Sequence, residues 1–546
     1  KNQLTNLNAS SCTLLTNLMC EENQITSLEI AGCTSLIALL CQDNQLTSLD
    51  VSGLTLLNDF QFEGNPLTNL YANRCTSLGT LDTSVCTSLE TIECTASKLT
   101  SLNISGLTGL TSLRCNNNQL TSLDASTNTS LKTLICYSNQ LTSLKVKNCT
   151  NLKTLSCSGN QLTSLDVSGL TSMTDLDAGG NQLTSLNVSG CIVLSVFHFG
   201  NNPLTTLNTS GCTLLKTLDV SVCPTLVTLY CSDGKLTTLN VSGLTSLKSL
   251  NCSNNQLTTL EIKGLSSLVT LDCTGNSLTS LDASNCTALT TLNVSGMTKL
   301  RTLSVSGCSA LKTLSCSGGQ LTNLNVSSCT LLETLSCSSN QLTSLNVNGL
   351  TSLKTFACFG NQLASLDVSN CAALTSLHCS NNQLTTLNVS GCKALLDLRC
   401  ETNKLTSLNV DNCTLLKTLH FDNNQVTSIN LNKNTALTSL KCVGNQLTSL
   451  DVSKNTALTT LNCVNNKLTS LNVSGLVSLN DFQFKGNPLT GLYANVCTSL
   501  GTLDASVCKS IETLECYSSG LTGLNVNGLT SLKSLRCEYN QLPSLD

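Results

Sequence analysis

A pattern of 21 residues repeats along the chain, and this period limits the fold more than any other feature. Each repeat has a first-type half of ten residues, LxCxxNxLxx, and a second-type half of eleven residues, LxVSxxxxLxx, as in LKTLSCSGNQLTSLDVSGLTS at residues 152–172. Successive first-type halves begin at Leu377, Leu398, Leu419, Leu440 and Leu461. Units this short bury their apolar side chains by stacking on one another.

Each half predicts one short strand followed by a corner. The first and third positions are apolar and the second is polar, which is the alternation of a half-buried strand. The Gly, Asn and Ser residues that follow favour turns. We therefore expect an all-β fold, a right-handed parallel β-solenoid with two short strands per coil, coils about 4.8 Å apart, and little or no helix. The repeats predict a single continuous solenoid over residues 1–546.

The composition argues against several classes of protein. Only 11% of the residues are charged, there is no Trp, and the mean hydropathy is +0.15, which is unlike a multi-domain enzyme or a disordered chain. Ser, Thr and Asn interrupt the apolar residues too often for a membrane span. The net charge of −4 gives no basic face for nucleic acid. We predict no membrane insertion and no nucleic-acid partner.

The sequence offers no catalytic centre. It has three His, and it lacks GxSxG, HExxH, Walker and GxGxxG motifs. Asp166 stands at the outward second position of a second-type strand, but Asn187 holds the same position in another repeat, so a solvated row is favoured over paired catalytic carboxylates. We predict a protein that is not an enzyme, with no catalytic residues, no cofactor and no metal.

Asparagine marks the corner of the first-type half. It occupies the sixth position in 19 of the 23 first-type halves, and an amide there can bond to backbone groups of its own and neighbouring coils. We predict a structural asparagine ladder. A simple preference for left-handed turns would also select Asn, and this alternative stays open. Representative ladder positions are Asn44, Asn160, Asn361 and Asn445.

The four exceptions to the asparagine pattern follow extra second-type halves. These extra halves begin at Leu81, at Leu218, at Leu292 and Leu303 as a pair, and at Leu503. The asparagine of the next first-type half is replaced at Ser97, Gly234, Gly319 and Ser519. If an extra half occupies a full strand position, the next first-type strand stacks on a second-type strand. We predict that the two kinds of strand are interchangeable and that each single insertion moves the first-type strands to the opposite sheet.

The 34 cysteines occupy two fixed positions. Eighteen, such as Cys115 and Cys316, take the inward third position of the first-type strand, and sixteen, such as Cys149, take the sixth position of the second-type half, where Leu54 stands in another repeat. A position that exchanges Cys for Leu is an apolar packing position. No CxxC pair suggests zinc. We expect buried free thiols rather than disulfides.

The motif LxxLxCxxNxLxxLxVSxxxx resembles the leucine-rich-repeat family, in its bacterial 21-residue variety with nested halves. The resemblance covers essentially the whole chain. It implies an extracellular or cell-surface location and a role in binding partners or adhering to hosts and matrices. This chain departs from ordinary members by having two nearly equal halves, so we expect a straighter solenoid than their horseshoe.

Variable residues mark the candidate binding surface. The outward position of first-type strands changes from repeat to repeat, whereas the same position in second-type strands is nearly always Asn or Asp. Variation on a fixed scaffold is typical of a partner-reading face, although unconstrained exposed positions also vary. Adjacent cations in this row need an offset, from Glu401 and Asp422 or from an anionic partner. The candidates, with exposed tyrosines as further anchors, are Arg114, Tyr137, His198, Tyr230, His378, Arg399, His420, Lys441 and Arg536.

We expect an extracellular scaffold or adhesin that binds protein or glycan partners. Two alternatives stay open at this point: a filament element that stacks end to end, and an ice-binding surface. The sequence begins and stops within a repeat, and residues 58–86 recur almost unchanged 422 residues later. These features favour open ends that self-associate and a fragment of a longer array.

Overall fold

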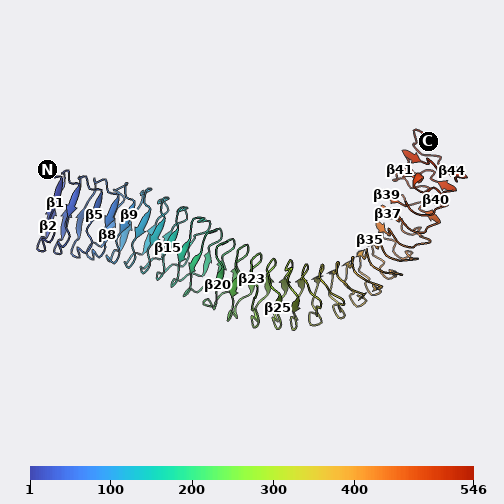
Figure 1. The fold of residues 1–546 in the computed structure, drawn as a ribbon, viewed down its shortest axis with the longest axis horizontal. Coiled ribbons are helices and arrows are strands. Elements are labelled where there is room, and N and C mark those ends of the chain that lie inside the picture. Colours follow the sequence, from blue (N-terminus) through green and yellow to red (C-terminus); the bar gives the residue numbers. More distant parts are fainter. Residues whose placement is uncertain (546) are drawn as a thin grey trace. The chain divides into compact units, whose positions relative to one another are not determined.

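The computed structural model describes residues 1–545 as parallel strands of three residues joined by tight corners. The chain divides into an N-terminal unit, Lys1–Glu261, and a C-terminal unit, Ile262–Asp546. Within each unit the coils stack with their strands side by side (Figure 1). The predicted fold class is confirmed, and the one helical element among the described residues is a 3₁₀ turn, η1 (Ala505–Val507). The prediction of one continuous solenoid stays a prediction.

The N-terminal unit holds three longer sheets. In strand order they are β2 (Asn17–Met19), β4 (Ala38–Leu40), β6 (Asp59–Gln61); β5 (Ser48–Asp50), β7 (Asn69–Tyr71), β9 (Thr91–Glu93), β11 (Ser112–Arg114), β13 (Thr133–Ile135), β15 (Thr154–Ser156), β16 (Asp175–Asp177), β18 (Val196–His198); and β17 (Ser185–Asn187), β19 (Thr206–Asn208), β21 (Thr228–Tyr230), β23 (Ser249–Asn251). It also holds the pairs β1 (Asn6–Asn8) with β3 (Ser27–Glu29), β8 (Thr80–Asp82) with β10 (Ser101–Asn103), β12 (Ser122–Asp124) with β14 (Ser143–Lys145), and β20 (Thr217–Asp219) with β22 (Thr238–Asn240).

The C-terminal unit repeats this arrangement with two longer sheets. They are β24 (Thr270–Asp272), β26 (Thr291–Asn293), β28 (Thr313–Ser315), β29 (Thr334–Ser336), β30 (Thr355–Ala357), β32 (Ser376–His378), β34 (Asp397–Arg399), β35 (Thr418–His420), β36 (Ser439–Lys441), β37 (Thr460–Asn462), β39 (Asp481–Gln483); and β38 (Ser470–Asn472), β40 (Gly491–Tyr493), β42 (Thr513–Glu515), β44 (Ser534–Arg536). The pairs are β25 (Ser280–Asp282) with β27 (Thr302–Ser304), β31 (Ser365–Asp367) with β33 (Thr386–Asn388), and β41 (Thr502–Asp504) with β43 (Gly523–Asn525).

The exchange of strand types at the insertions is confirmed. The second-type strand β7 pairs directly with the first-type strand β9, with Leu70 opposite Ile92, immediately after the extra half at Leu81. The same change of type occurs where β19 pairs with β21 and where β40 pairs with β42. The double insertion restores the original arrangement, because β26 lies between the first-type strands β24 and β28.

The asparagines of the first-type corners tie each coil to the preceding one. The Nδ2 group of Asn44 donates to Cys41 O at 3.1 Å in its own coil and to Cys20 O at 2.9 Å in the coil before, and its Oδ1 accepts from Ile25 N at 3.0 Å. Asn160, Asn361 and Asn445 make the same set of bonds. One buried side chain therefore satisfies backbone groups of two coils, which a preference for turn conformation alone does not explain.

The corners that lack asparagine have less room. A Cβ atom added to Gly234 would lie 2.7 Å from Asn255 Oδ1, and one added to Gly319 would lie 2.9 Å from Asn340 Oδ1 and 3.2 Å from Leu300 O. At Ser97 the short hydroxyl donates to Ala72 O at 2.6 Å instead. At Gly234 and Gly319 there is thus no space for the amide, and at Ser97 a hydroxyl takes its place as donor.

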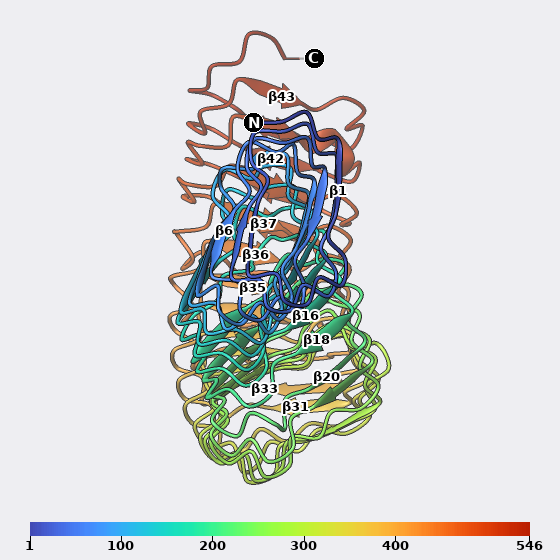
Figure 2. The same ribbon diagram turned by 90° about the vertical axis from the view of Figure 1, so that its left-hand side faces the viewer.

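The two kinds of strand are not equally well paired. First-type strands continue from coil to coil in the longer sheets, whereas many second-type strands form only two-stranded sheets. Figure 2 shows the first-type strand β6 and the second-type strand β1 on opposite sides of the N-terminal coils. The asparagine bonds hold the spacing at first-type corners, while most second-type corners carry Leu or Cys at the corresponding position. The second-type strands are therefore paired less continuously than the first-type strands.

The cysteines are free and mostly buried, with Cys12 exposed and Cys537 half-buried. The thiols of second-type corners also donate hydrogen bonds, which the sequence did not indicate. Cys149 Sγ lies 3.2 Å from Ala125 O, and Cys392 Sγ lies 3.2 Å from Val368 O, in each case 24 residues back. Asn455 occupies a second-type corner and its Nδ2 reaches the equivalent Leu431 O at 3.1 Å. A Cys or Asn side chain at this position therefore donates a hydrogen bond to a carbonyl in addition to filling the packing position.

Two asparagines in one C-terminal coil provide a matched pair of substitutions. Asn445→Cys removes the acceptor for Val426 N and one donor, so we expect it to destabilise the fold by about 2 kcal/mol. The Oδ1 atom of buried Asn455 has no partner, and its Nδ2 donates to Leu431 O and to Asn434 O. Asn455→Cys keeps a donor for Leu431 O, loses the bond to Asn434 O and removes the unpaired oxygen. We expect no loss, or a gain of up to about 1 kcal/mol. Urea unfolding followed by circular dichroism measures both, and equal losses would contradict the assigned bonds.

Burial of the thiols predicts sensitivity to alkali. Burial raises the pKa of Cys115 and of Cys316 from the ordinary 9.0 to about 12. An unfolded chain therefore releases these protons from about pH 9, while the folded chain retains them, so stability is lost between these values as the pH rises. Each such thiol contributes a slope of about 1.4 kcal/mol per pH unit. The urea midpoint should fall steeply above about pH 9 and stay level near pH 7, and an unchanged midpoint at about pH 10 would refute this.

Candidate functional site

The C-terminal unit brings four of the predicted binding residues into one row. His378 on β32, Arg399 on β34, His420 on β35 and Lys441 on β36 are direct register partners on consecutive strands. The strand pairing keeps them in register. Each follows a buried leucine, for example Leu398, so the alternation of the strand turns all four side chains away from the core. We call these four residues the cationic row.

Carboxylates of the same face offset the cationic row. Asp397 Oδ1 lies 3.2 Å from Arg399 Nε, and Glu401 Oε1 lies 3.6 Å from His420 Nδ1. Glu401 also accepts a hydrogen bond from the Ser380 hydroxyl. The role proposed for Glu401 is thus supported by a contact, and Asp397 is a partner that the sequence reasoning missed. Its position two residues before Arg399, on the same side of the strand, was the available signal.

His378 and the carboxylates beside the cationic row have different surroundings. The His378 ring stacks on Phe359 with centroids 4.5 Å apart, and burial lowers its pKa. Burial and the nearby Glu401 raise the pKa of Asp422, whose Oδ1 accepts from Val443 N at 2.6 Å. Burial alone would raise the pKa of Glu401, but hydrogen bonds from His420 and Ser380 outweigh it and lower the pKa. The row is a mixed-charge surface rather than a basic one.

The other five predicted residues do not join this row. In the N-terminal unit, Arg114 and His198 lie on one sheet, separated by the outward residues of β13, β15 and β16, while Tyr230 lies on the sheet of β17 and β19. Tyr137 follows β13 and is half-buried. Arg536 belongs to the sheet of β38 and β40, not to that of the cationic row, and its guanidinium lies 4.7 Å from the Tyr517 ring centroid.

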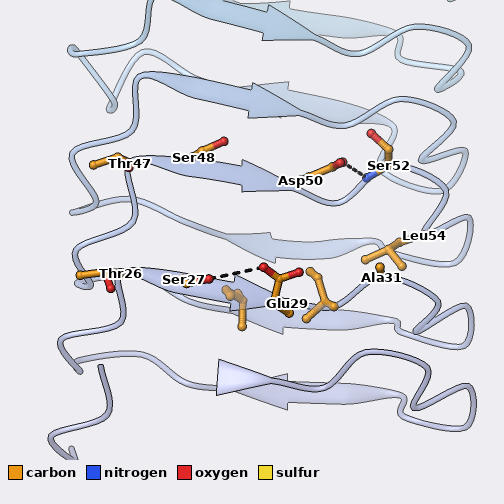
Figure 3. Close-up of a pocket in the computed structure, with 11 residues that line it drawn as sticks. Thr26, Ser27, Glu29, Ala31, Thr47, Ser48, Asp50, Ser52 and Leu54 are labelled. Carbon is orange, nitrogen blue, oxygen red and sulfur yellow. Dashed lines mark hydrogen bonds between the residues drawn. The ribbon is translucent and has the colours of Figure 1, made fainter. Parts of the chain in front are cut away.

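The outward faces of second-type strands carry hydroxyl groups and carboxylates in shallow grooves. Figure 3 shows one groove, of about 300 Å³, across β3 and β5. Asp50 Oδ1 accepts from Ser52 N at 2.9 Å, and Ser27 Oγ lies 3.4 Å from Glu29 Oε1. Asp166 and Asn187 each accept from the backbone N–H two residues further on, at 3.1 and 3.0 Å. Asp and Asn interchange here because either oxygen closes this turn.

Residues 1–545 hold neither a metal-binding cluster nor a membrane-spanning helix. No three His, Cys, Asp or Glu side chains lie close enough together to hold a metal ion. No helix in this range has the length and apolar character needed to cross a membrane.

The repeat places the chain in a known class. A family model described as leucine rich repeats (2 copies) matches residues 150–190, which include β15 and β17. The same 21-residue pattern recurs along the chain, with parallel strands at this spacing in both units. The chain is a leucine-rich-repeat protein.

Solved structures give more distant likenesses. A functional domain of InlJ from Listeria monocytogenes, which includes a cysteine ladder, is 28% identical over 77% of this chain and 75% of that chain, with a TM-score of 0.32. The protein LIC12759 from Leptospira interrogans is 25% identical over 66% and 91%, with a TM-score of 0.32. YopM from Yersinia enterocolitica is 21% identical over 94% and 90%, with a TM-score of 0.35. No curated protein matches the chain.

Removing the compensating carboxylates should make the cationic row repulsive. Asp397→Asn with Glu401→Gln removes the carboxylate partners of Arg399 and His420, which stand on the same face as Lys441. We expect a loss of about 1 kcal/mol at low salt, reduced at 0.5 M NaCl by screening. Urea unfolding at both salt concentrations tests this, with Asp367→Asn on a second-type strand as the control. A salt-independent loss would show that the carboxylates act only by packing.

Proposed function

We propose that this leucine-rich-repeat protein is a non-enzymatic scaffold that binds partners through the outward faces of its first-type strands. This proposal rests mainly on the register of the cationic row, where four outward side chains stand on consecutive strands of one sheet. A rigid sheet that presents changing side chains on an unchanging frame suits recognition of another macromolecule. The variable strands β9 to β18 offer a second such face in the N-terminal unit.

The partner we propose is a protein or a glycan, and the setting is the outside of a bacterial cell. Mixed charge, an aromatic–imidazole stack and exposed arginine are features of protein-binding surfaces. The compensating carboxylates favour a partner with both charges over a purely anionic one. The extracellular location follows the resemblance to secreted and surface-attached bacterial repeat proteins, and it makes this scaffold an adhesin.

Adhesion measurements test this proposal. The variant H378S/R399S/H420N/K441N uses residues that other first-type strands carry at the same position, such as Ser156 and Asn251. Beads coated with it should bind immobilised matrix proteins or mucin glycans at least about tenfold less than beads coated with the unaltered chain. The control, Asp367→Asn with Asn388→Asp, changes a second-type face. Equal losses in both variants, or no binding by the unaltered chain above albumin-coated beads, would overturn the proposal.

A further inference from the structure

A pair of phenylalanines stands in the last first-type strand before each single insertion. The sequences are DFQF at 59–62, VFHF at 196–199 and DFQF at 481–484. In each pair the rings are tilted, with centroids 4.6, 4.5 and 4.8 Å apart. The first-type sheets end at these strands, since β6, β18 and β39 do not pair with the extra strands β8, β20 and β41.

Neither the insertion nor a single phenylalanine accounts for the interruption. The first-type strand β24 pairs with the second-type strand β26 at the double insertion, where no phenylalanine is present. Phe356 takes the middle position of β30 and Phe421 follows β35, and both strands pair on both sides. The interruption accompanies two phenylalanines together, whose rings take more space than the usual Leu and Cys.

Each interruption in the N-terminal unit forms a groove between two strand edges. The first, here called the Phe60 groove, has a volume of about 470 Å³ and is lined by β6 and β8, including Phe60, Phe62 and Leu81, and by Val85. The second, of about 370 Å³, is lined by the equivalent Phe197, Phe199, Leu218 and Val222. Val85 is 59% exposed and Val222 is 53% exposed. The same apolar side chains thus build the same groove twice.

The groove edges have backbone groups without strand partners. In a regular coil the third-position N–H donates to the next strand, as Cys41 N does to Gln61 O at 2.9 Å. Phe62 N instead lies 3.1 Å from the Glu63 carboxylate of its own strand end. On the opposite edge, Thr80 N turns back to Leu78 O at 2.6 Å. Unpaired strand edges of this kind favour the addition of an extended chain.

The charge of the Phe60 groove indicates the charge of the chain that it would bind. Asp59, Glu63 and Asp82 line it, and no Lys, Arg or His does. The second groove has Asp219 and His198 in the equivalent region. We propose that the Phe60 groove binds an extended, basic segment of a partner polypeptide, whose apolar side chains enter between the phenylalanines and Val85 while its cations meet the carboxylates. The second groove binds the same class of segment more weakly.

The Phe60 groove shares no residue with the cationic row, so this proposal can be tested independently of the proposed function. The probe is a fluorescein-labelled peptide of alternating Lys and Val, compared with alternating Glu and Val and with alternating Lys and Ser. Fluorescence anisotropy measures binding to the full chain. Hydrogen exchange of residues 58–63 and 79–83 reports the location. We expect the Lys–Val peptide to bind best and to protect these residues.

The variants use residues that the repeat already accepts. Asp59→Asn with Asp82→Asn removes two charges, and we expect about tenfold weaker binding at low salt. Phe60→Leu with Phe62→Cys restores the ordinary strand residues and should abolish binding. Phe356→Leu with Phe421→Cys, in the C-terminal unit, is the matched control and should bind normally, as should H378S/R399S/H420N/K441N. Circular dichroism verifies that each variant is folded.

Two results would overturn this proposal. One is equal binding of the Lys–Val and Glu–Val peptides, which would show that the carboxylates do not select the partner. The other is unchanged binding or unchanged exchange at residues 58–63 in the folded Phe60→Leu, Phe62→Cys variant. Loss of adhesion in the cationic-row variant with normal peptide binding would separate the two surfaces.

Discussion

The buried asparagine of the first-type corner is the interaction on which the stacking depends. A coil of three-residue strands has too few apolar contacts of its own to fold alone, so its stability comes from the coils beside it. Asn44 illustrates the connection, because its amide bonds to carbonyls of two coils and its oxygen accepts from the preceding coil. These bonds lie away from water, where an unpaired backbone group is costly. Repetition of the bond fixes the spacing of the first-type strands.

The second-type corners have a weaker connection, and this difference gives the coil two unlike sides. A thiol such as that of Cys149 donates one bond to the preceding coil, and a leucine in its place donates none. First-type strands accordingly form long sheets, and second-type strands often form pairs. A continuous sheet holds outward side chains in register, whereas an interrupted sheet leaves grooves between strands. The variable residues stand on the continuous side, where their relative positions are best defined.

Single insertions divide these faces. Because an extra half takes one strand position, the first-type strands change sheet, and the variable residues continue on the other side of the coil. Within the N-terminal unit, His198 and Tyr230 are therefore on different sheets although they occupy equivalent strand positions. The paired phenylalanines occur at these same boundaries. The insertions thus set both the extent of each variable face and the location of the apolar grooves.

Sequence alone determined the class of fold, the inward positions of leucine and cysteine, and the interchange of strand types. All three follow from periodicity, since a repeat of two alternating segments has few ways to bury its apolar positions, and a missing asparagine reports which strand lies beneath. The cationic row could also be placed, because four consecutive repeats without insertion must stack in register. Asp397 was visible beside Arg399, but its pairing depends on the direction of both side chains.

Only the tertiary structure decided the features of the molecule that depend on the distances between coils. The donor role of the Cys149 thiol, the crowding at Gly319, the unequal pairing of the two strand types and the grooves beside Phe60 and Phe197 depend on how closely one coil approaches the next. A repeat pattern gives the order of the coils but not these separations. A strand edge is paired only where a carbonyl and an amide of neighbouring strands come within hydrogen-bond distance.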